Sequence, residues 1–369
     1  MTYTSIVESE ENPWKGMIFT DPASTTDGDW AQYGCFKVAD YTDKDISGDL
    51  FLAILSGDAE KAAKLTGKEN PKVLHAGPED TVFTYFMDHG GEGSLYINDD
   101  EVSATDVINA IQQAKDKKLY GKWLWFVEAC FSGSVFNKLP ADWNIFVMTS
   151  ANEHEMARLT NCPPNDIVAG KSLEACIAGL FDNSFLSYYE THPECTIGEI
   201  VDFVQQDVAT SSKQGVSQWG DMSFRDFLLS EFIGIVPSHS SMNRKIEETT
   251  SIALNEVSEH IAKWKVIRAD PSNLEDRVSL LKKEVFQKAK EEIEMKRLAR
   301  VFFEEKEIVN VLSSYPDEYS QECVHSLTQQ LIHQCHHSIP FSVETISLLR
   351  NICKNQRTFV SSLFDDICL

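Results

Sequence analysis

Two short, almost entirely apolar segments constrain the fold of this chain more than any other feature of its sequence. They are Thr81–Met87 and Lys122–Val127, both rich in β-branched and aromatic residues and both followed by small or turn-forming residues. Such runs are typical of parallel strands that are buried on both faces. Between them, Ala104–Lys118 repeats apolar residues at helical spacing. A strand, a helix and a second strand in this order predict a βαβ unit and therefore an α/β fold.

Three further segments extend this pattern. The apolar run Trp143–Thr149 is expected to form another strand, and the spacing of apolar residues predicts helices over Leu173–Leu186 and Ile197–Val208. We therefore expect residues 1–236 to form one α/β domain, with a mostly parallel sheet flanked by helices.

The character of the chain changes at Pro237–Ser241. From Met242 onwards the sequence contains no glycine and is rich in Glu, Lys, Leu and Ile. Lys282–Leu312 alternates charged and apolar residues at the helical period, with Glu-to-Lys spacings that support exposed helix faces. These features predict a linker over residues 237–275 and an all-helical domain over residues 276–369.

Charge and hydrophobicity exclude some classes of protein. The formal net charge is −24, which argues against a nucleic-acid partner because phosphate binding requires a basic surface. No apolar run approaches the ~20 residues that a membrane-spanning helix needs. The first residues, MTYTSIVESEENP, lack the basic and apolar regions of a signal peptide.

Two motifs with chemical potential follow the two apolar strands. DHGG, which contains His89 and Gly90, comes after the first strand, and EACFSGS, which contains Cys130, comes after the second. The carboxyl ends of neighbouring parallel strands meet at one edge of a sheet, so we expect His89 and Cys130 to lie close together. A neighbouring histidine promotes the thiolate form of cysteine. The N–H groups of Gly90 and Cys130 are candidates for stabilising an oxyanion.

A simpler interpretation exists for each residue alone. A buried cysteine after a strand usually serves packing, and a histidine at a strand end is usually a satisfied polar group. The two residues together, each within a glycine-containing motif, favour a catalytic pair instead.

The motifs DHGG and EACFSGS resemble those of the legumain (asparaginyl endopeptidase) branch of the caspase-like cysteine peptidases. Other segments are similar to legumain segments in the same order, namely EENPWKGMIF, DYTDKDISGDLFLAILSGDAE, KVLHAGPEDTVFTYF, LPADWNIFVMTSANEHE and VSQWGD. The resemblance implies that His89 and Cys130 form the catalytic dyad and that Gly90 and Cys130 supply the oxyanion-hole amides. It also implies that Glu128 forms the acidic wall of the primary specificity pocket.

Two other pocket positions depart from the family pattern. Met156 stands where the family has a pocket serine, and Lys171 lies near the expected position of a pocket aspartate. The resemblance therefore leaves open which residue is recognised at the cleavage site. It also implies that the first strand and helix of the fold, which carry a catalytic Asn and a substrate-reading Arg, are missing before EENP.

The helical part contains four of the nine cysteines. A metal site there would use His333, Cys335, His336 and His337. Their spacing fits no common zinc pattern, and we expect no metal or organic cofactor. The resemblance to the legumain pro-domain implies two disulfides, Cys323–Cys353 and Cys335–Cys368. The pairing of the remaining cysteines outside EACFSGS stays open, for Cys35, Cys162, Cys176 and Cys195.

These disulfides require an oxidising compartment. We expect a lysosomal, vacuolar or secreted protein whose signal peptide lies upstream of Met1. In legumains the C-terminal region inhibits the enzyme until acid and cleavage of the linker release it. Asn273 is the candidate processing site, with Asn243 and Asn255 as alternatives.

The sequence thus predicts a cysteine endopeptidase made as an acid-activated zymogen, acting on peptide or protein substrates. Three alternatives remain. They are a pseudoenzyme that binds peptides through the same cleft, an enzyme like the glycolipid-anchor transamidase, and an inactive fragment.

Overall fold

A computed structural model provides the three-dimensional structure of the protein. It describes residues 39–234 except 99 and 213, parts of 1–19, residues 252–253, 257–268 and 274–314, and parts of 316–328 and 343–354. The chain divides into an N-terminal unit, Met1–Val257, and a C-terminal unit, Ser258–Leu369.

The main sheet of the N-terminal unit has four strands in the order β1-β5-β6-β11. They are β1 (Thr81–Met87), β5 (Lys122–Glu128), β6 (Ile145–Thr149) and β11 (Ser217–Gly220). The first three strands are mutually parallel, and β11 runs antiparallel to β6. The predicted α/β class with a mostly parallel sheet is therefore confirmed.

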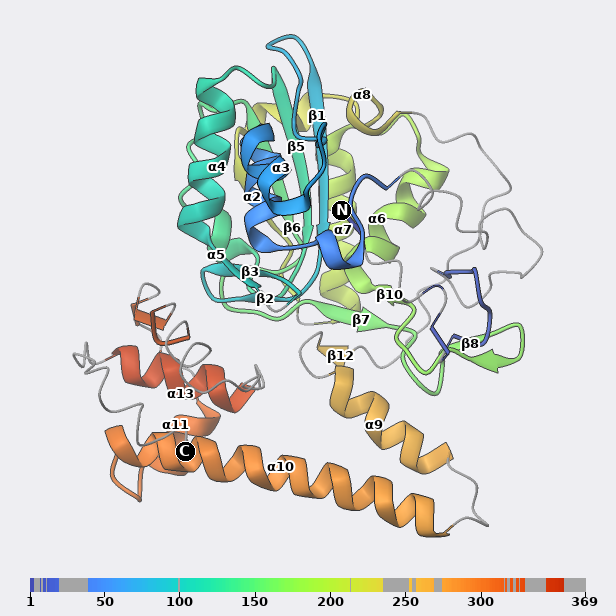
Figure 1. Cartoon of the computed structure of the whole chain (residues 1–369), viewed down its shortest axis with the longest axis vertical. Helices are drawn as coiled ribbons and strands as arrows, with labels where there is room; N and C mark the ends of the chain where they lie inside the picture. Colours follow the sequence, from blue (N-terminus) through green and yellow to red (C-terminus); the bar gives the residue numbers. More distant parts are fainter. Residues whose placement is uncertain are drawn as a thin grey trace. The chain divides into compact units, whose positions relative to one another are not determined.

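Helices cover both faces of this sheet (Figure 1). One face packs against α2 (Gly48–Leu55) and α4 (Ala104–Asp116), through Trp123 and Trp125 among other residues. The opposite face packs against α6 (Leu180–Thr191) and α7 (Ile197–Ser211). Successive residues of a strand point to opposite faces, so the uninterrupted apolar runs arise because both faces are buried.

Shorter elements surround this core. A small sheet in the order β2-β3-β4 follows the first strand, and a second sheet has the order β10-β7-β12. The bounds of these and the other small elements of the unit are α3 (Ala59–Thr66), β2 (Gly90–Gly91), β3 (Ser94–Ile97), β4 (Asp100–Ser103), α5 (Gly133–Phe136), β7 (Arg158–Thr160), β8 (Ile167–Val168), β9 (Lys171–Ser172), β10 (Ala178–Gly179), α8 (Ser230–Ile233) and β12 (Ile252–Ala253).

The predicted helix over Leu173–Leu186 is wrong in its first half. Helix α6 begins only at Leu180, and the preceding residues include β10. The Gly179 N–H donates to the Asp182 carboxylate, 3.3 Å away, and this cap starts the helix there. A disulfide between Cys162 and Cys176 also ties the chain before the helix to an earlier loop.

The described elements of the C-terminal unit are helices. They include α9 (Val257–Arg268), which begins at the unit boundary, the long helix α10 (Leu274–Phe302), α11 (Ile308–Ser313) and α13 (Val343–Lys354). The predicted continuous helical period over Lys282–Leu312 is interrupted by a turn at residues 305–307. In the described part of the chain, no helix combines the length and the apolar character needed to cross a membrane.

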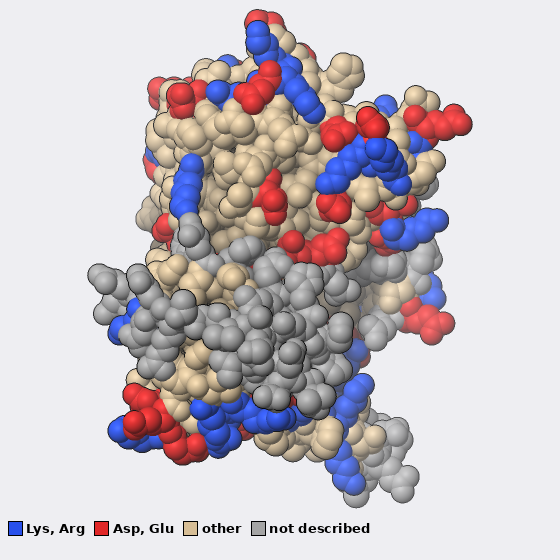
Figure 2. All heavy atoms as spheres, turned by 60° about the vertical axis from the view of Figure 1, so that its left-hand side comes forward, with Lys and Arg blue, Asp and Glu red and all other residues tan. Residues whose placement is uncertain are grey.

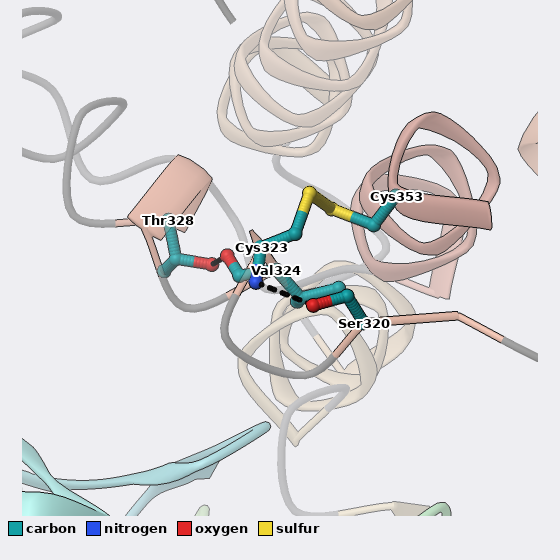
Figure 3. The surroundings of a disulfide bond; sticks show 5 residues. All are labelled: Ser320, Cys323, Val324, Thr328 and Cys353. Atoms are coloured by element: carbon teal, nitrogen blue, oxygen red, sulfur yellow. Dashed lines mark hydrogen bonds between the residues drawn. A yellow bond between two sulfur atoms is a disulfide. The ribbon is translucent and has the colours of Figure 1, made fainter. Parts of the chain in front are cut away.

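A disulfide joins Cys323 to Cys353 within the C-terminal unit (Figure 3). This is the first of the two pairs that the resemblance implies. Cys335 and Cys368 lie outside the described residues, as do His333, His336 and His337. The processing candidates Asn243, Asn255 and Asn273 also lie outside them.

Candidate active site

The parallel register of β1 and β5 brings the two sequence motifs together. Met87 stands opposite Glu128, and the Asp88 N–H donates to the Glu128 carbonyl oxygen over 3.2 Å. Two residues further on, Gly90 lies directly against the Cys130 backbone, because a Cβ atom added to Gly90 would lie 2.1 Å from the Cys130 carbonyl oxygen. The backbones of the DHGG and EACFSGS segments are therefore in direct contact at the carboxyl edge of the sheet.

The turn after β1 fixes the backbone around His89, whose side chain is exposed. The His89 N–H donates to the Asp88 carboxylate over 2.8 Å, and the Tyr96 N–H donates to the His89 carbonyl over 3.0 Å. Gly90 pairs with Leu95 at the next position of the β2–β3 ladder. Hydrogen-bonded and non-hydrogen-bonded pairs alternate in an antiparallel ladder. Because His89 and Tyr96 form a hydrogen-bonded pair, Gly90 and Leu95 form a non-hydrogen-bonded one, and the Gly90 N–H points away from β3.

Cys130 is completely buried at the end of β5. Its thiol donates to the Ala157 carbonyl oxygen, with an Sγ to oxygen distance of 3.9 Å. The next residue, Phe131, has a φ of 55°, which is uncommon for a residue with a large side chain. The Phe131 N–H donates to the Glu155 carbonyl over 2.7 Å, and this bond stabilises the sharp turn that follows the cysteine.

Backbone and hydroxyl groups from three other segments anchor this loop. The Ala129 N–H donates to the Ser150 hydroxyl over 3.2 Å, and the Gly133 N–H donates to the Ala151 carbonyl over 3.1 Å. The Ser134 hydroxyl accepts the Gly93 N–H at 2.7 Å and so joins the loop to the β2–β3 turn. The position of Cys130 relative to Gly90 is thus supported from both motifs.

Two carboxyl groups, those of Glu128 at the end of β5 and Asp182 in α6, lie close together. Glu128 is completely buried, and both the Glu128 carboxyl and the Asp182 carboxyl lie within 3.0 Å of a Cβ added to Gly179. The Tyr85 hydroxyl donates to the Asp182 carboxylate over 2.7 Å. Burial, and next the charge of Asp182, raise the pKa of Glu128 well above its usual range. A protonated Glu128 carboxyl is a potential hydrogen-bond donor beside Asp182.

The raised pKa of Glu128 makes stability depend on pH. The folded state binds the Glu128 proton more tightly than the unfolded state does, and this difference adds to the free energy of unfolding. The added stability is complete below the unfolded pKa of about 4.3 and is lost as pH rises through the folded pKa. Glu128→Gln cannot ionise. We expect its melting temperature to equal that of the wild type near pH 4 and to exceed it by a few degrees at pH 7.

Thermal unfolding across this pH range measures the effect, with Asp142→Asn, at an exposed position, as the control. Parallel melting curves for the wild type and Glu128→Gln at every pH would contradict the prediction.

The sequence predicted Met156 and Lys171 as positions of the substrate pocket, but it did not identify Asp182. Met156 is half-buried and lies between Glu155 and Ala157, whose carbonyl oxygens accept the bonds from Phe131 and Cys130. Lys171 extends over the Trp14 ring, with its ammonium 4.0 Å from the ring centre. The signal that could have identified Asp182 was its position three residues after Gly179, at the start of an apolar helix.

The structure also separates the cysteines by role. Cys162 and Cys176 form a disulfide, while Cys130 and Cys195 remain buried thiols. Burial raises the pKa of Cys195 to about 11, which suits a packing residue. Among the described residues, no group of three or more His, Cys, Asp or Glu side chains is arranged to bind a metal ion.

The fold and the site together define the caspase-like α/β class, in which motifs at adjacent strand ends meet at the edge of a mostly parallel sheet. The chain belongs to the Peptidase C13 family, whose model matches residues 1–235.

Three curated relatives illustrate the similarity. Legumain of Mus musculus is 41% identical over 155 residues, 42% of this chain and 34% of that protein. Hemoglobinase of Schistosoma japonicum is 29% identical over 283 residues, 76% of this chain and 62% of that protein. Vacuolar-processing enzyme beta-isozyme 1 of Oryza sativa subsp. indica is 29% identical over 252 residues, 66% of this chain and 49% of that protein. The matches thus cover between a third and two thirds of these relatives.

Proposed function

We propose that this protein is a cysteine endopeptidase of the legumain type, with Cys130 as the nucleophile and His89 as the general acid and base. The observation that supports this most strongly is the contact between Gly90 and the Cys130 backbone at adjacent strand ends. Membership of the Peptidase C13 family supports the same assignment.

In the proposed reaction the Cys130 thiolate attacks the carbonyl carbon of a peptide bond. The carbonyl oxygen gains negative charge, which the N–H groups of Gly90 and Cys130 stabilise. The imidazolium of His89 protonates the leaving amine, and a thioester remains on Cys130. Water activated by His89 then releases the acid product and restores the thiol. The Cys130 side chain must rotate away from the Ala157 carbonyl before it can attack.

The carboxyl pair of Glu128 and Asp182 suits recognition of an asparagine side chain. A protonated Glu128 beside Asp182 offers both a hydrogen-bond donor and acceptors, as a carboxamide requires. Glu128 comes from the strand that also positions the nucleophile, because it lies two residues before Cys130. We propose cleavage after asparagine on this basis.

The same site is proposed to be regulated by the chain itself. Strand β12 pairs antiparallel with β7, with Ile252 opposite Leu159 and Ala253 opposite Arg158. Strand β7 begins directly after Ala157, the residue that binds the Cys130 thiol. An extended peptide commonly binds by adding a strand to a sheet edge, so β12 occupies an edge that a substrate could use. Release of this segment on acidification and cleavage of the linker would then activate the zymogen.

A proline at position 253 tests this regulation. Ala253→Pro removes a backbone N–H from the β12 strand and disfavours its pairing. We expect the unprocessed variant to hydrolyse a peptide at least several-fold faster than the unprocessed wild type. After cleavage of the linker the two should have equal activity, which serves as the internal control. Equal activity before processing would contradict the role of β12.

A peptide-binding protein without catalysis is the second candidate, favoured by the complete burial of Cys130. A peptide with a thiol-reactive group separates the two functions. A peptidase is labelled at Cys130, whereas a binding protein retains the peptide without covalent capture. Absence of labelling in acid-processed protein would contradict the peptidase proposal.

The relatives also bear on where the protein acts. One is named a vacuolar-processing enzyme and others are legumains. We propose a lysosomal or vacuolar location, with the C-terminal unit as inhibitor of the N-terminal unit. The two described disulfides are compatible with an oxidising route to that compartment.

A further inference from the structure

A tyrosine hydroxyl reaches the two carboxyl groups from the end strand of the main sheet. Strand β1 is the first in the order of this sheet, and its Tyr85 stands opposite Phe126 of β5 in the parallel register. Residues two apart in a strand point to the same face, so Phe126 and Glu128 both face α6. Tyr85 shares this face, because paired residues of neighbouring strands point the same way.

Two residues of α6 hold the Tyr85 side chain. Its ring lies beside that of Phe185, with 6.1 Å between the ring centres, and its hydroxyl donates to Asp182 Oδ1 over 2.7 Å. Asp182 and Phe185 are three residues apart and therefore lie on the same side of the helix. The other oxygen of Asp182, Oδ2, accepts the Gly179 N–H at 3.3 Å. Both oxygens of Asp182 thus act as hydrogen-bond acceptors.

Glu128 is in a different environment. The red Asp and Glu side chains on the face shown in Figure 2 lie at the surface, where water solvates them. Glu128 is completely buried, and neither of its carboxyl oxygens has a hydrogen bond of normal geometry to a described residue. Burial favours its protonated form. The two carboxyls therefore differ, since Asp182 accepts while Glu128 has a hydrogen to donate to a ligand.

We propose that Tyr85 is a positioning residue of the specificity pocket, which keeps Asp182 a hydrogen-bond acceptor and thereby makes the pocket select a carboxamide over a carboxylate. This inference rests on the asparagine recognition proposed above. A hydrogen bond donated to a carboxylate favours its ionised form. The carboxamide of a substrate can then donate to Asp182 and accept from Glu128, whereas a substrate carboxylate offers acceptors alone and is repelled by the charge of Asp182.

Removal of the hydroxyl should weaken this selection. Tyr85→Phe keeps the ring beside Phe185 but removes the donor to Asp182. The ionised form of Asp182 then loses a stabilising hydrogen bond, and a pair with both carboxyls protonated can donate to both oxygens of an aspartate side chain. We expect the ratio of kcat/KM for an asparagine peptide to kcat/KM for the matched aspartate peptide to fall at least about tenfold.

Two peptides that differ only in asparagine or aspartate before the scissile bond measure this ratio at one acidic pH. Misfolded protein lowers both rates equally, so a loss of stability alone cannot change the ratio. Tyr120→Phe is the matched control, because the Tyr120 hydroxyl donates to the Trp143 carbonyl, over 3.0 Å, and not to a carboxyl of the pocket. Its ratio should stay within about twofold of the wild-type value.

A second variant tests whether Tyr85 acts through Asp182. In Asp182→Asn the hydroxyl has no carboxylate to stabilise, so adding Tyr85→Phe should change the ratio by less than about twofold. An unchanged ratio in Tyr85→Phe would overturn the proposal. So would the same fall in both backgrounds, or a wild type without preference for asparagine.

Peptide binding separates this proposal from that of peptidase activity. We expect Cys130→Ser to bind the asparagine peptide more tightly than the aspartate peptide, and addition of Tyr85→Phe to lower this preference at least about tenfold. If the wild type cleaves neither peptide but binding shows this loss, the peptidase proposal fails and the role of Tyr85 stands. If cleavage occurs and Tyr85→Phe leaves the ratio unchanged, only the role of Tyr85 is overturned. Neither cleavage nor binding of either peptide would overturn both.

Discussion

Replacing Cys130 with serine is expected to lower peptide hydrolysis by about a thousandfold or more in acid-processed protein. A hydroxyl is far less acidic than a thiol, so His89 cannot supply a comparable nucleophile. Steady-state hydrolysis of a peptide with a single asparagine measures the loss. Cys195→Ser provides the control, because Cys195 is also a buried thiol of the N-terminal unit.

The control should retain at least about half of the wild-type rate, because Cys195 belongs to the core that α6 and α7 form against the sheet and not to either motif. His89→Ala should lose activity comparably to Cys130→Ser, and the double variant should lose little more, because the two residues act as a unit. Substantial hydrolysis by Cys130→Ser would remove Cys130 from the mechanism.

Gly90→Ala is expected to damage both activity and stability. Its new methyl group would lie 2.1 Å from the Cys130 carbonyl oxygen and 3.0 Å from the Ala129 side chain. The carbonyl is backbone, so either DHGG or the cysteine loop must move. We expect about 1–3 kcal/mol of lost unfolding free energy, as for other overpacked sites. The displaced Gly90 N–H should lower kcat by a further factor of about 100.

Gly77→Ala is the matched control, because a Cβ there would meet only the Asp80 carboxylate, at 3.4 Å. Denaturant unfolding gives the stability change, and kcat/KM of the folded fraction gives the catalytic change. A Gly90→Ala protein as stable and active as Gly77→Ala would show that the two motifs are not in contact.

The sequence predicted the central sheet well because its strands are buried on both faces. Thr81–Met87 forms β1 over the same residues, and the predicted strand at Lys122–Val127 is extended by Glu128 alone. Continuous apolar runs of this kind have few alternatives in an α/β protein. The contact between the motifs followed from a general property of parallel strands, namely that their carboxyl ends meet at one edge.

The region between β6 and α6 was not predictable in the same way. Its strands β8, β9 and β10 contain two residues each, too few to produce a period in the sequence. The Cys162–Cys176 bond and the contact between Glu128 and Asp182 join residues that have no local pattern in common. Tertiary packing, rather than propensity, determines these parts, so Asp182 was missed.

The distribution of cysteines has a practical consequence for handling the protein. The proposed mechanism needs Cys130 as a thiol, whereas Cys162–Cys176 and Cys323–Cys353 are disulfides in the folded protein. A reductant added to keep Cys130 reduced also attacks both disulfides by thiol–disulfide exchange. Purification therefore calls for a mild redox buffer at acidic pH, where exchange is slow, rather than for a strong dithiol at neutral pH.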